Sequence, residues 1–211
     1  LEEINQFNIL WITYDSKIDI NDKSNFQHTF EKILKVLKNA KKKALVIVST
    51  QIPIGTIKKL ENYDKRNLKK NFRFIYIPEN LRLGNGLEIF LKSSSIVIGL
   101  RNLSDKKIIN NVISGIKSKK LFVNIETAEL TKHIINSYLA CSITLINEIS
   151  SIASQYNVPF EELEKCVKTD ERISTKAYLR PGNSFSGGTL ARDINYLIAA
   201  NKKINSKNIL L

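Results

Sequence analysis

The chain has 211 residues, of which 43% are hydrophobic and 25% charged, and its formal net charge is +13. This length allows one large or two small soluble domains. The basic charge is spread over scattered lysines, without interleaved aromatic residues or a nucleic-acid motif, so we expect no nucleic-acid partner.

Two cysteines are too few for a disulfide framework, and no apolar run reaches the length of a membrane span. No signal peptide opens the chain, so we expect a cytoplasmic protein without a membrane partner. Cys141 lies among apolar residues and is expected to be a small buried hydrophobe. The chain starts at Leu1 without a methionine, which suggests a fragment whose N-terminal part is missing.

The first 125 residues alternate short apolar segments, rich in β-branched and aromatic residues, with segments of helical spacing. Strands are predicted at residues 8–14, 44–49, 72–77, 95–100 and 121–125. Helices are predicted at residues 30–37, directly after Thr56, and at residues 106–116. This alternation predicts an α/β fold with a doubly wound, mostly parallel sheet.

Polar residues follow several of these strands. In a doubly wound sheet, ligands bind at the carboxyl ends of the strands. Ser16, Thr50 and Glu79 stand at such ends, and Lys132 follows the last strand on the helix that leaves the sheet. Each one alone reads equally well as a turn residue, but their joint placement predicts a ligand site at this edge.

A long helix is predicted over residues 126–157, because apolar residues recur every three or four positions and no proline or glycine interrupts them. A helix of this length with apolar groups on more than one face typically joins two domains or packs on a partner subunit. Lys132 and Asn136 are four residues apart and share one face, where they can hold an oxygen that gains negative charge. His133 points about 100° away from Lys132, which favours a structural role for this histidine.

Beyond the long helix only further helices are predicted, at residues 159–168 and 190–203. The loop before the last helix contains glycine, serine and threonine. Such a loop either exposes backbone N–H groups to a phosphate or simply caps the helix. Arg192 and Asp193 are expected in the first turn of that helix.

Five segments of the chain carry short motifs in a characteristic order. They are Ser49-Thr50 with Pro53 and Gly55, Pro78-Glu79 with Leu81-Arg82, Glu126 to Asn136 with Asn147-Glu148, Asp170 with Arg172-Ile173, and Pro181-Gly182 to Asp193. In order and spacing these segments resemble the nucleotide-sugar dehydrogenase family, typified by UDP-glucose and GDP-mannose dehydrogenases. The resemblance covers most of the chain.

Enzymes of that family have an N-terminal NAD-binding domain, a central helical dimerisation domain and a C-terminal nucleotide-binding domain. The resemblance implies that residues 1–125 are the latter part of a Rossmann-like NAD-binding domain and residues 126–211 the central, all-α domain. It also implies a homodimer through the long helix at residues 126–157. The opening glycine-rich unit and the C-terminal domain would then be missing, and the chain contains no G-x-G-x-x-G motif.

Members of the family oxidise the C6 alcohol of a nucleotide sugar to a carboxylate with two NAD molecules. By this resemblance, Lys132 stabilises the alkoxide and the later oxyanion, and Asn136 helps to hold that oxygen. Asp193 orients a water or acts as general base, Thr50 holds the same water, and Glu79 acts in the hydrolytic step. The resemblance therefore implies an NAD-dependent oxidoreductase that acts on CH–OH groups.

The resemblance also implies binding residues for the cofactor NAD and for a UDP-sugar substrate. Cofactor contacts are expected at Ser16, Thr50, Leu83 and Arg192. Substrate contacts are expected at Leu81, Arg82, Lys132, Asn136, Arg172, Tyr178, Phe185 and Gly187. Arg172 would reach the substrate of the partner subunit, which ties activity to the dimer. The sequence shows no cluster with metal-ligand spacing.

Two positions depart from the family pattern. The nucleophilic cysteine of the family stands four residues before the aspartate, where this chain has Thr189, and Leu83 stands where many members have a glutamate. A threonine hydroxyl has no accessible anion near pH 7, so we hypothesise a two-electron oxidation of the sugar alcohol. Two alternatives stay open: a catalytically inactive relative that binds these ligands or serves as a dimerisation module, and a two-electron hydroxy-acid dehydrogenase.

Overall fold

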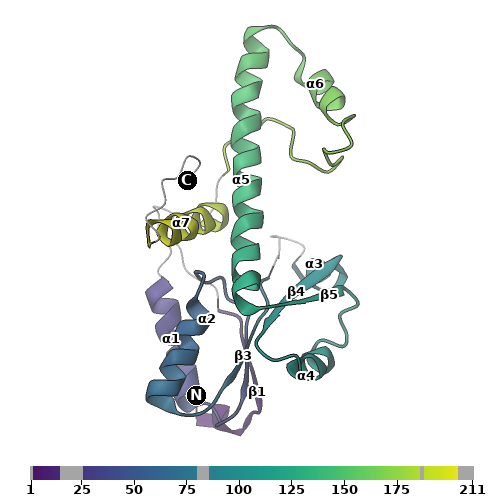
Figure 1. The fold of residues 1–211 in the computed structure, drawn as a ribbon. Helices are drawn as coiled ribbons and strands as arrows, with labels where there is room; N and C mark the ends of the chain where they lie inside the picture. Colours follow the sequence, from purple (N-terminus) through teal and green to yellow (C-terminus); the bar gives the residue numbers. More distant parts are fainter. Residues whose placement is uncertain (1, 15–25, 80–85, 186–187, 204–211) are drawn as a thin grey trace. The chain divides into compact units, whose positions relative to one another are not determined.

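The computed structural model describes residues 2–14, 26–79, 86–185 and 188–203 (Figure 1). The chain forms two compact units, Leu1–Lys132 (unit 1) and His133–Leu211 (unit 2). The division between them falls within the long helix α5 (Ile125–Gln155). The domain boundary expected between residues 125 and 126 stays a prediction.

Unit 1 is an α/β unit, as predicted. Its elements in chain order are a 3-10 helix (Glu2–Gln6), β1 (Ile9–Ile12), α1 (Phe26–Asn39), β2 (Leu45–Val48), α2 (Thr56–Tyr63), a π-helical turn (Asp64–Leu68), β3 (Arg73–Tyr76), α3 (Gly86–Lys92), β4 (Ser95–Leu100), α4 (Asp105–Val112) and β5 (Lys119–Val123). All five predicted strands are present, each within its expected range or displaced by two residues. The 3-10 helix and α3 were not predicted, and α1 begins four residues before its expected start.

The five strands form one sheet in the order β1-β2-β3-β4-β5. Neighbouring strands are parallel except β3 and β4, which are antiparallel, so the sheet is mostly parallel as predicted. Gly99 of β4 pairs with Tyr76 of β3 on one side and with Val123 of β5 on the other. The last residues of β3 and β5 therefore lie at the same level, and α5 begins close to the carboxyl end of β3.

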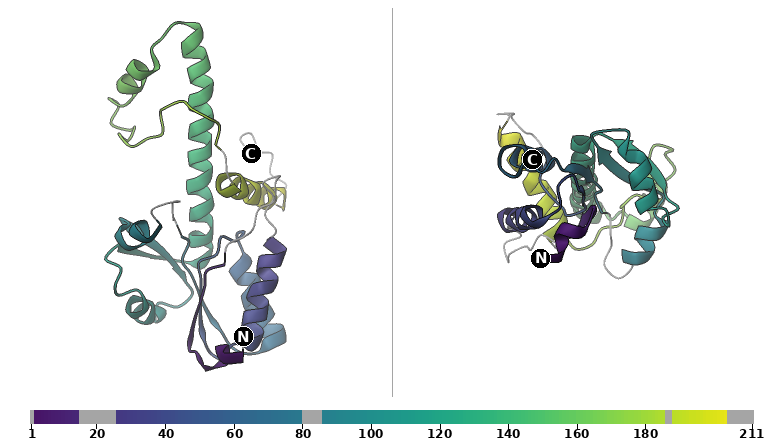
Figure 2. Two further views of the ribbon diagram at one scale, coloured as in Figure 1. Left: turned by 180° about the vertical axis from the view of Figure 1, so that it is seen from behind. Right: turned by 90° about the horizontal axis from the view of Figure 1, so that it is seen from below.

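Both faces of the sheet are covered, which explains why its strands are continuous apolar runs. Alternate residues of a strand point to opposite faces, and in β2 Val46 and Val48 belong to one hydrophobic cluster while Leu45 and Ile47 belong to another. The first cluster includes residues of α1 and α2, and the second includes Ile109 of α4. Figure 2 shows α1 and α2 on one side of the sheet and α4 on the other.

Gly99 sets how closely the start of α5 approaches β4. A Cβ atom at this position would lie 2.7 Å from Ala128 Cβ and 2.9 Å from Ile125 Cα, closer than carbon atoms pack. Only glycine therefore allows this contact. Arg101, directly after β4, holds the same turn of α5 by donating to the carboxylates of Glu61 and Glu126. These hydrogen bonds hold the pKa of the Glu126 carboxyl below its ordinary value.

Over its described residues, unit 2 is all-helical, as predicted. It contains the remainder of α5, then α6 (Phe160–Val167) and α7 (Gly188–Lys203). Helix α7 begins two residues before its expected start, because glycine costs little in the first helical positions, where backbone N–H groups need no helical partner. Arg192 and Asp193 therefore lie in the second turn and not in the first. Among the described residues, no helix is both long and apolar enough to cross a bilayer.

Candidate active site

In unit 1, polar residues follow β2 where the site was predicted. The Ser49 hydroxyl accepts a hydrogen bond from Trp11 Nε1 at 2.8 Å, which ties the end of β2 to β1. The next side chain, Thr50, is 1% exposed, and its hydroxyl has no hydrogen-bond partner among the described residues. A buried hydroxyl left in this state costs about 1–3 kcal/mol, so it is suited to receive a bound polar group. Glu79, half-buried, follows β3 at the neighbouring strand end.

Glu129 connects α5 to the segment that follows Thr50. Its side chain is 0% exposed, and its two oxygens accept hydrogen bonds from the backbone N–H groups of Gly55, at 2.6 Å, and Ile57, at 2.9 Å. This carboxylate therefore caps the N-terminus of α2, where the helix dipole also favours negative charge. Gly55 takes the left-handed conformation that glycine permits, with φ +81°. The capping role of Glu129 was not predicted.

Lys132 follows Glu129 by three residues on α5 and is 8% exposed. A lysine is rarely buried to this extent unless its ammonium has a role or a partner. Four residues further along, Asn136 points to the same side of the helix and is 5% exposed. Their four-residue spacing on α5 is that of side chains on one helix face, and a shared oxygen site at these two residues stays a prediction.

In unit 2, α5 and α7 bring three polar side chains together: His133, Asn136 and Asp193. Asp193 is 0% exposed. Asn136 Nδ2 donates a hydrogen bond to Asp193 Oδ2, and His133 Nδ1 lies 2.6 Å from Asp193 Oδ1. Each carboxylate oxygen therefore has its own partner on α5. An aspartate held in this way is fixed in orientation and is suited to take a proton from a positioned hydroxyl or water.

His133 was expected to have only a structural role. It is 1% exposed, as that interpretation requires, but its contact with Asp193 places it in the candidate site. The 100° angle between His133 and Lys132, one residue earlier, gives no information on this contact. His133 and Asn136 are three residues apart, and helical residues with this spacing lie side by side. This spacing was the feature of the sequence that could have placed His133 beside the predicted site residue Asn136.

Two other predicted residues lie on α7. Arg192, beside Asp193 in sequence, is 4% exposed. Thr189, at the position of the family cysteine, is exposed in the first turn of α7. It precedes Asp193 by four residues, so the two side chains are on the same side of the helix.

Two of the substrate contacts predicted further along unit 2, Arg172 and Tyr178, lie in the segment between α6 and α7. Figure 1 shows α6 and its loop near the C-terminal end of α5, whereas α7 lies toward the other end of this helix. In this loop, Arg172 donates to both carboxylate oxygens of Asp170, at 2.9 and 2.6 Å, and lowers the pKa of that carboxyl. Phe185, half-buried, is the last described residue before α7.

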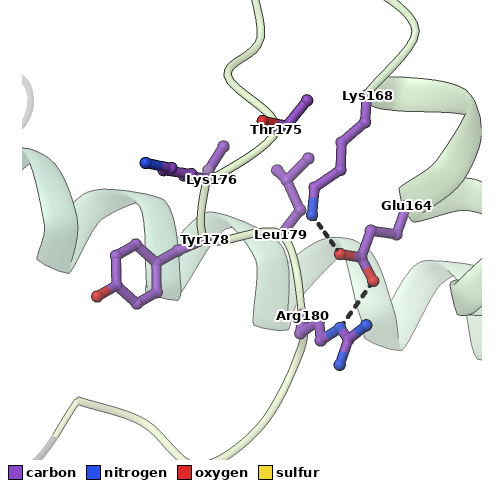
Figure 3. A pocket seen from close by; sticks show the side chains of 8 residues that line it. Glu164, Lys168, Thr175, Lys176, Tyr178, Leu179 and Arg180 are labelled. Atoms are coloured by element: carbon purple, nitrogen blue, oxygen red, sulfur yellow. Dashed lines mark hydrogen bonds and ion pairs between the residues drawn. The ribbon is translucent and has the colours of Figure 1, made fainter.

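A small pocket of about 260 Å³ lies between α6 and this loop (Figure 3). Glu164 accepts hydrogen bonds there from Lys168, at 2.6 Å, and from Arg180, at 3.0 Å, and these two cations lower the pKa of its carboxyl. Tyr178 also lines the pocket and is 50% exposed. Ligand pockets usually have volumes of roughly 300–1,000 Å³, so this pocket lies just below the usual range.

Several predicted contacts fall outside the described residues: Ser16, Leu81, Arg82, Leu83 and Gly187. Among the residues that the structure describes, no three histidine, cysteine, aspartate or glutamate side chains form a group able to hold a metal ion.

Comparison with protein families gives two matches that together include most of the chain. Residues 2–117 match the NAD binding domain of the UDP-glucose/GDP-mannose dehydrogenase family, and residues 126–211 match the central domain of the same family. NAD is thus the cofactor of the family domain that unit 1 matches.

Comparison with individual proteins also finds similarity to UDP-glucose dehydrogenases. The chain is 30% identical over 213 residues to UDP-glucose 6-dehydrogenase of Rickettsia bellii, a match that covers 98% of this chain and 48% of that protein. The chain spans about half the length of the curated relatives it matches.

Two solved structures share the fold. A UDP-glucose dehydrogenase from Pyrobaculum islandicum has a TM-score of 0.81 and 22% identity, with 96% of this chain and 48% of that chain covered. A UDP-D-ManNAc dehydrogenase from Pyrococcus horikoshii has a TM-score of 0.80 and 24% identity, with 99% and 49% covered. The matched family domains, the Rossmann-type sheet and the shared motifs agree: this chain belongs to the UDP-glucose/GDP-mannose dehydrogenase family.

Proposed function

We propose that the complete gene product is an NAD-dependent oxidoreductase that oxidises an alcohol of a nucleotide sugar, with UDP-sugars as the substrate class. The observation that carries this proposal is the buried carboxylate of Asp193, which receives one contact from Asn136 and one from His133. Relatives with this chain's domains are named UDP-glucose 6-dehydrogenase, which supports the substrate class.

Alcohol oxidation removes a hydride from carbon and a proton from oxygen. The oxygen therefore gains negative charge, and we assign its stabilisation to the Lys132 ammonium together with the Asn136 amide, which share one face of α5. We assign the proton to the Asp193 carboxylate, directly or through one water. Bound NAD supplies the hydride acceptor.

The described residues include one group that fits the cofactor. The buried Thr50 hydroxyl, without a described partner at the carboxyl end of β2, is suited to a polar group of NAD or to a water beside it. The match of residues 2–117 to the family's NAD binding domain supports this assignment. Ser16, Leu83 and Arg192 remain predicted cofactor contacts.

We further propose that the reaction stops after two electrons. Oxidation of the aldehyde to the acid in this family proceeds through a cysteine, and the corresponding position four residues before Asp193 is Thr189. A hydroxyl is a far weaker nucleophile than a thiolate at neutral pH. Glu79, expected to serve the hydrolytic step, would then have no thioester to act on.

The product stoichiometry tests this proposal. The complete protein, incubated with NAD and a panel of UDP-sugars, is expected to form about one NADH per sugar consumed, because one hydride leaves each alcohol. Mass spectrometry after trapping with hydroxylamine should identify the product as the aldehyde oxime. Rapid formation of the uronate with two NADH per sugar would contradict the two-electron reaction, and no NADH with any sugar nucleotide would contradict the proposed activity.

We also propose that a second copy of the chain packs on α5. An apolar stripe on this helix, made of Ile134, Tyr138, Leu145 and Ile152, is exposed, with exposed fractions from 52 to 71%. Its spacing of four and seven residues is that of the seam between two packed helices. Cys141 lies in the stripe and is exposed, so its expected burial within the chain was wrong.

The oligomeric state tests this interface. Leu145→Lys places a charge in the stripe and is expected to convert a dimer into a monomer in light-scattering measurements at micromolar concentration. Ser154→Lys adds the same charge on the opposite side of α5 and should leave the dimer intact. A wild-type monomer, or a dimer that resists Leu145→Lys, would argue against this interface. The predicted cytoplasmic location is a separate hypothesis.

A further inference from the structure

Asp193 is 0% exposed, so its carboxylate must find its hydrogen bonds inside the protein and not in bulk water. Its Oδ2 accepts from Asn136 Nδ2, and its Oδ1 lies 2.6 Å from His133 Nδ1. An ionised carboxylate can only accept hydrogen bonds. In that state, His133 Nδ1 must therefore carry a hydrogen.

Removal of one of these donors would affect the carboxylate directly. A buried carboxylate that loses a hydrogen-bond donor is less able to stay ionised, and it is also free to rotate about its side-chain torsion. A general base requires both the charge and the orientation. His133 supplies one of the contacts from α5 that provide them.

The His133 ring is itself held in place by α7. The ring is 1% exposed, and its edge meets the Tyr196 ring at a centroid separation of 5.5 Å and an interplanar angle of 85°. Tyr196 follows Asp193 by three residues on α7, so the two side chains lie side by side. The imidazole is fixed between them with its Nδ1 on the carboxylate.

We propose that His133 is a positioning residue of the active site: it donates its Nδ1 hydrogen to Asp193 Oδ1 and thereby keeps the base charged and oriented. This proposal rests on the proposed function, in which Asp193 takes the proton of the alcohol. His133 acts through Asp193 and does not itself receive the substrate proton.

Two substitutions in the complete protein separate the donor from the ring. His133→Asn carries an amide nitrogen close to the place of Nδ1, whereas His133→Phe keeps a ring of similar size without a donor. His133→Phe is expected to lower kcat by about 10²-fold with KM for the UDP-sugar changed by less than about threefold, because the base is impaired and binding is not. His133→Asn should recover at least about a tenth of the wild-type kcat through the restored donor.

Two results would overturn this assignment. A wild-type kcat in His133→Phe would show that the histidine only packs, and a His133→Asn variant as slow as His133→Phe would show that the Nδ1 donor is not its function. A double-mutant cycle provides a test that does not depend on enzyme activity. Melting temperatures are measured for His133→Phe, Asp193→Asn and the double variant. The melting temperature of the double variant is expected to fall by less than the sum of the two single decreases. Additive decreases would refute the proposed interaction between His133 and Asp193. If the wild-type protein oxidises no UDP-sugar, the proposed function fails, and the double-mutant cycle still tests the interaction between His133 and Asp193.

Discussion

Replacement of Lys132 by alanine in the complete protein is expected to lower kcat for the UDP-sugar by about 10²–10³-fold, the usual cost of losing one stabiliser of a developing oxyanion. The lysine is 8% exposed on α5, four residues before Asn136, so most of its side chain is shielded from solvent. A fixed cation at this position acts mainly in the transition state, where the oxygen carries most charge. We therefore expect kcat to fall much more than KM rises.

Steady-state kinetics followed by NADH absorbance provide the measurement, and the matched control is Lys58→Ala. Lys58 is an exposed lysine on α2, and its loss is expected to leave both kinetic constants unchanged. Circular dichroism and UDP-sugar binding serve to test whether Lys132→Ala is folded. Unchanged turnover in Lys132→Ala would remove the lysine from the mechanism. A wild-type protein that binds UDP-sugar without forming NADH would support the alternative of an inactive relative.

The same residue illustrates what a sequence can predict. Lys132 and Asn136 lie on one helix, so their spacing alone places them on one face. The strands were predicted equally well, because short runs such as Leu45 to Val48 are apolar on both faces and are bounded by polar turns. The antiparallel direction of β4 was not evident, since a buried apolar run reads the same in either direction. Helix α3 begins at the last residue of a Gly-Asn-Gly stretch, which in the sequence resembles a continued loop.

The spacing of residues along the sequence could not predict contacts between distant segments. His133 and Asp193 are 60 positions apart, and nothing in the spacing of either helix states that α7 packs at that turn of α5. Glu129 is similar, because its carboxylate caps α2 across 74 and 72 positions. In the sequence, His133 and Glu129 resemble any other residue of α5, and only the fold shows which groups they contact. Tertiary packing thus shows the partners of two buried side chains, His133 and Glu129, which the spacing along one helix cannot give.

The position of Thr189 leads to the second large effect, a change in the product. Thr189→Cys places a thiol one helical turn before Asp193 on α7, in an exposed first turn where a helix N-terminus favours the thiolate. The thiolate is expected to add to the aldehyde carbon, loss of a second hydride to NAD then gives a thioester, and water releases the acid. NADH formed per UDP-sugar should rise from about one toward two as the product becomes a uronate.

Thr189→Ser is the matched control, because serine and cysteine differ by a single atom and serine keeps the weak hydroxyl nucleophile. It should still yield the aldehyde, with about one NADH per sugar. Mass spectrometry of Thr189→Cys stopped at short times should also show a protein adduct heavier by the acyl nucleotide sugar. If Thr189→Cys forms only aldehyde, this position on α7 does not reach the reacting carbon. If Thr189→Ser forms acid as fast as Thr189→Cys, the second oxidation needs no thiolate, and the two-electron proposal loses its chemical basis.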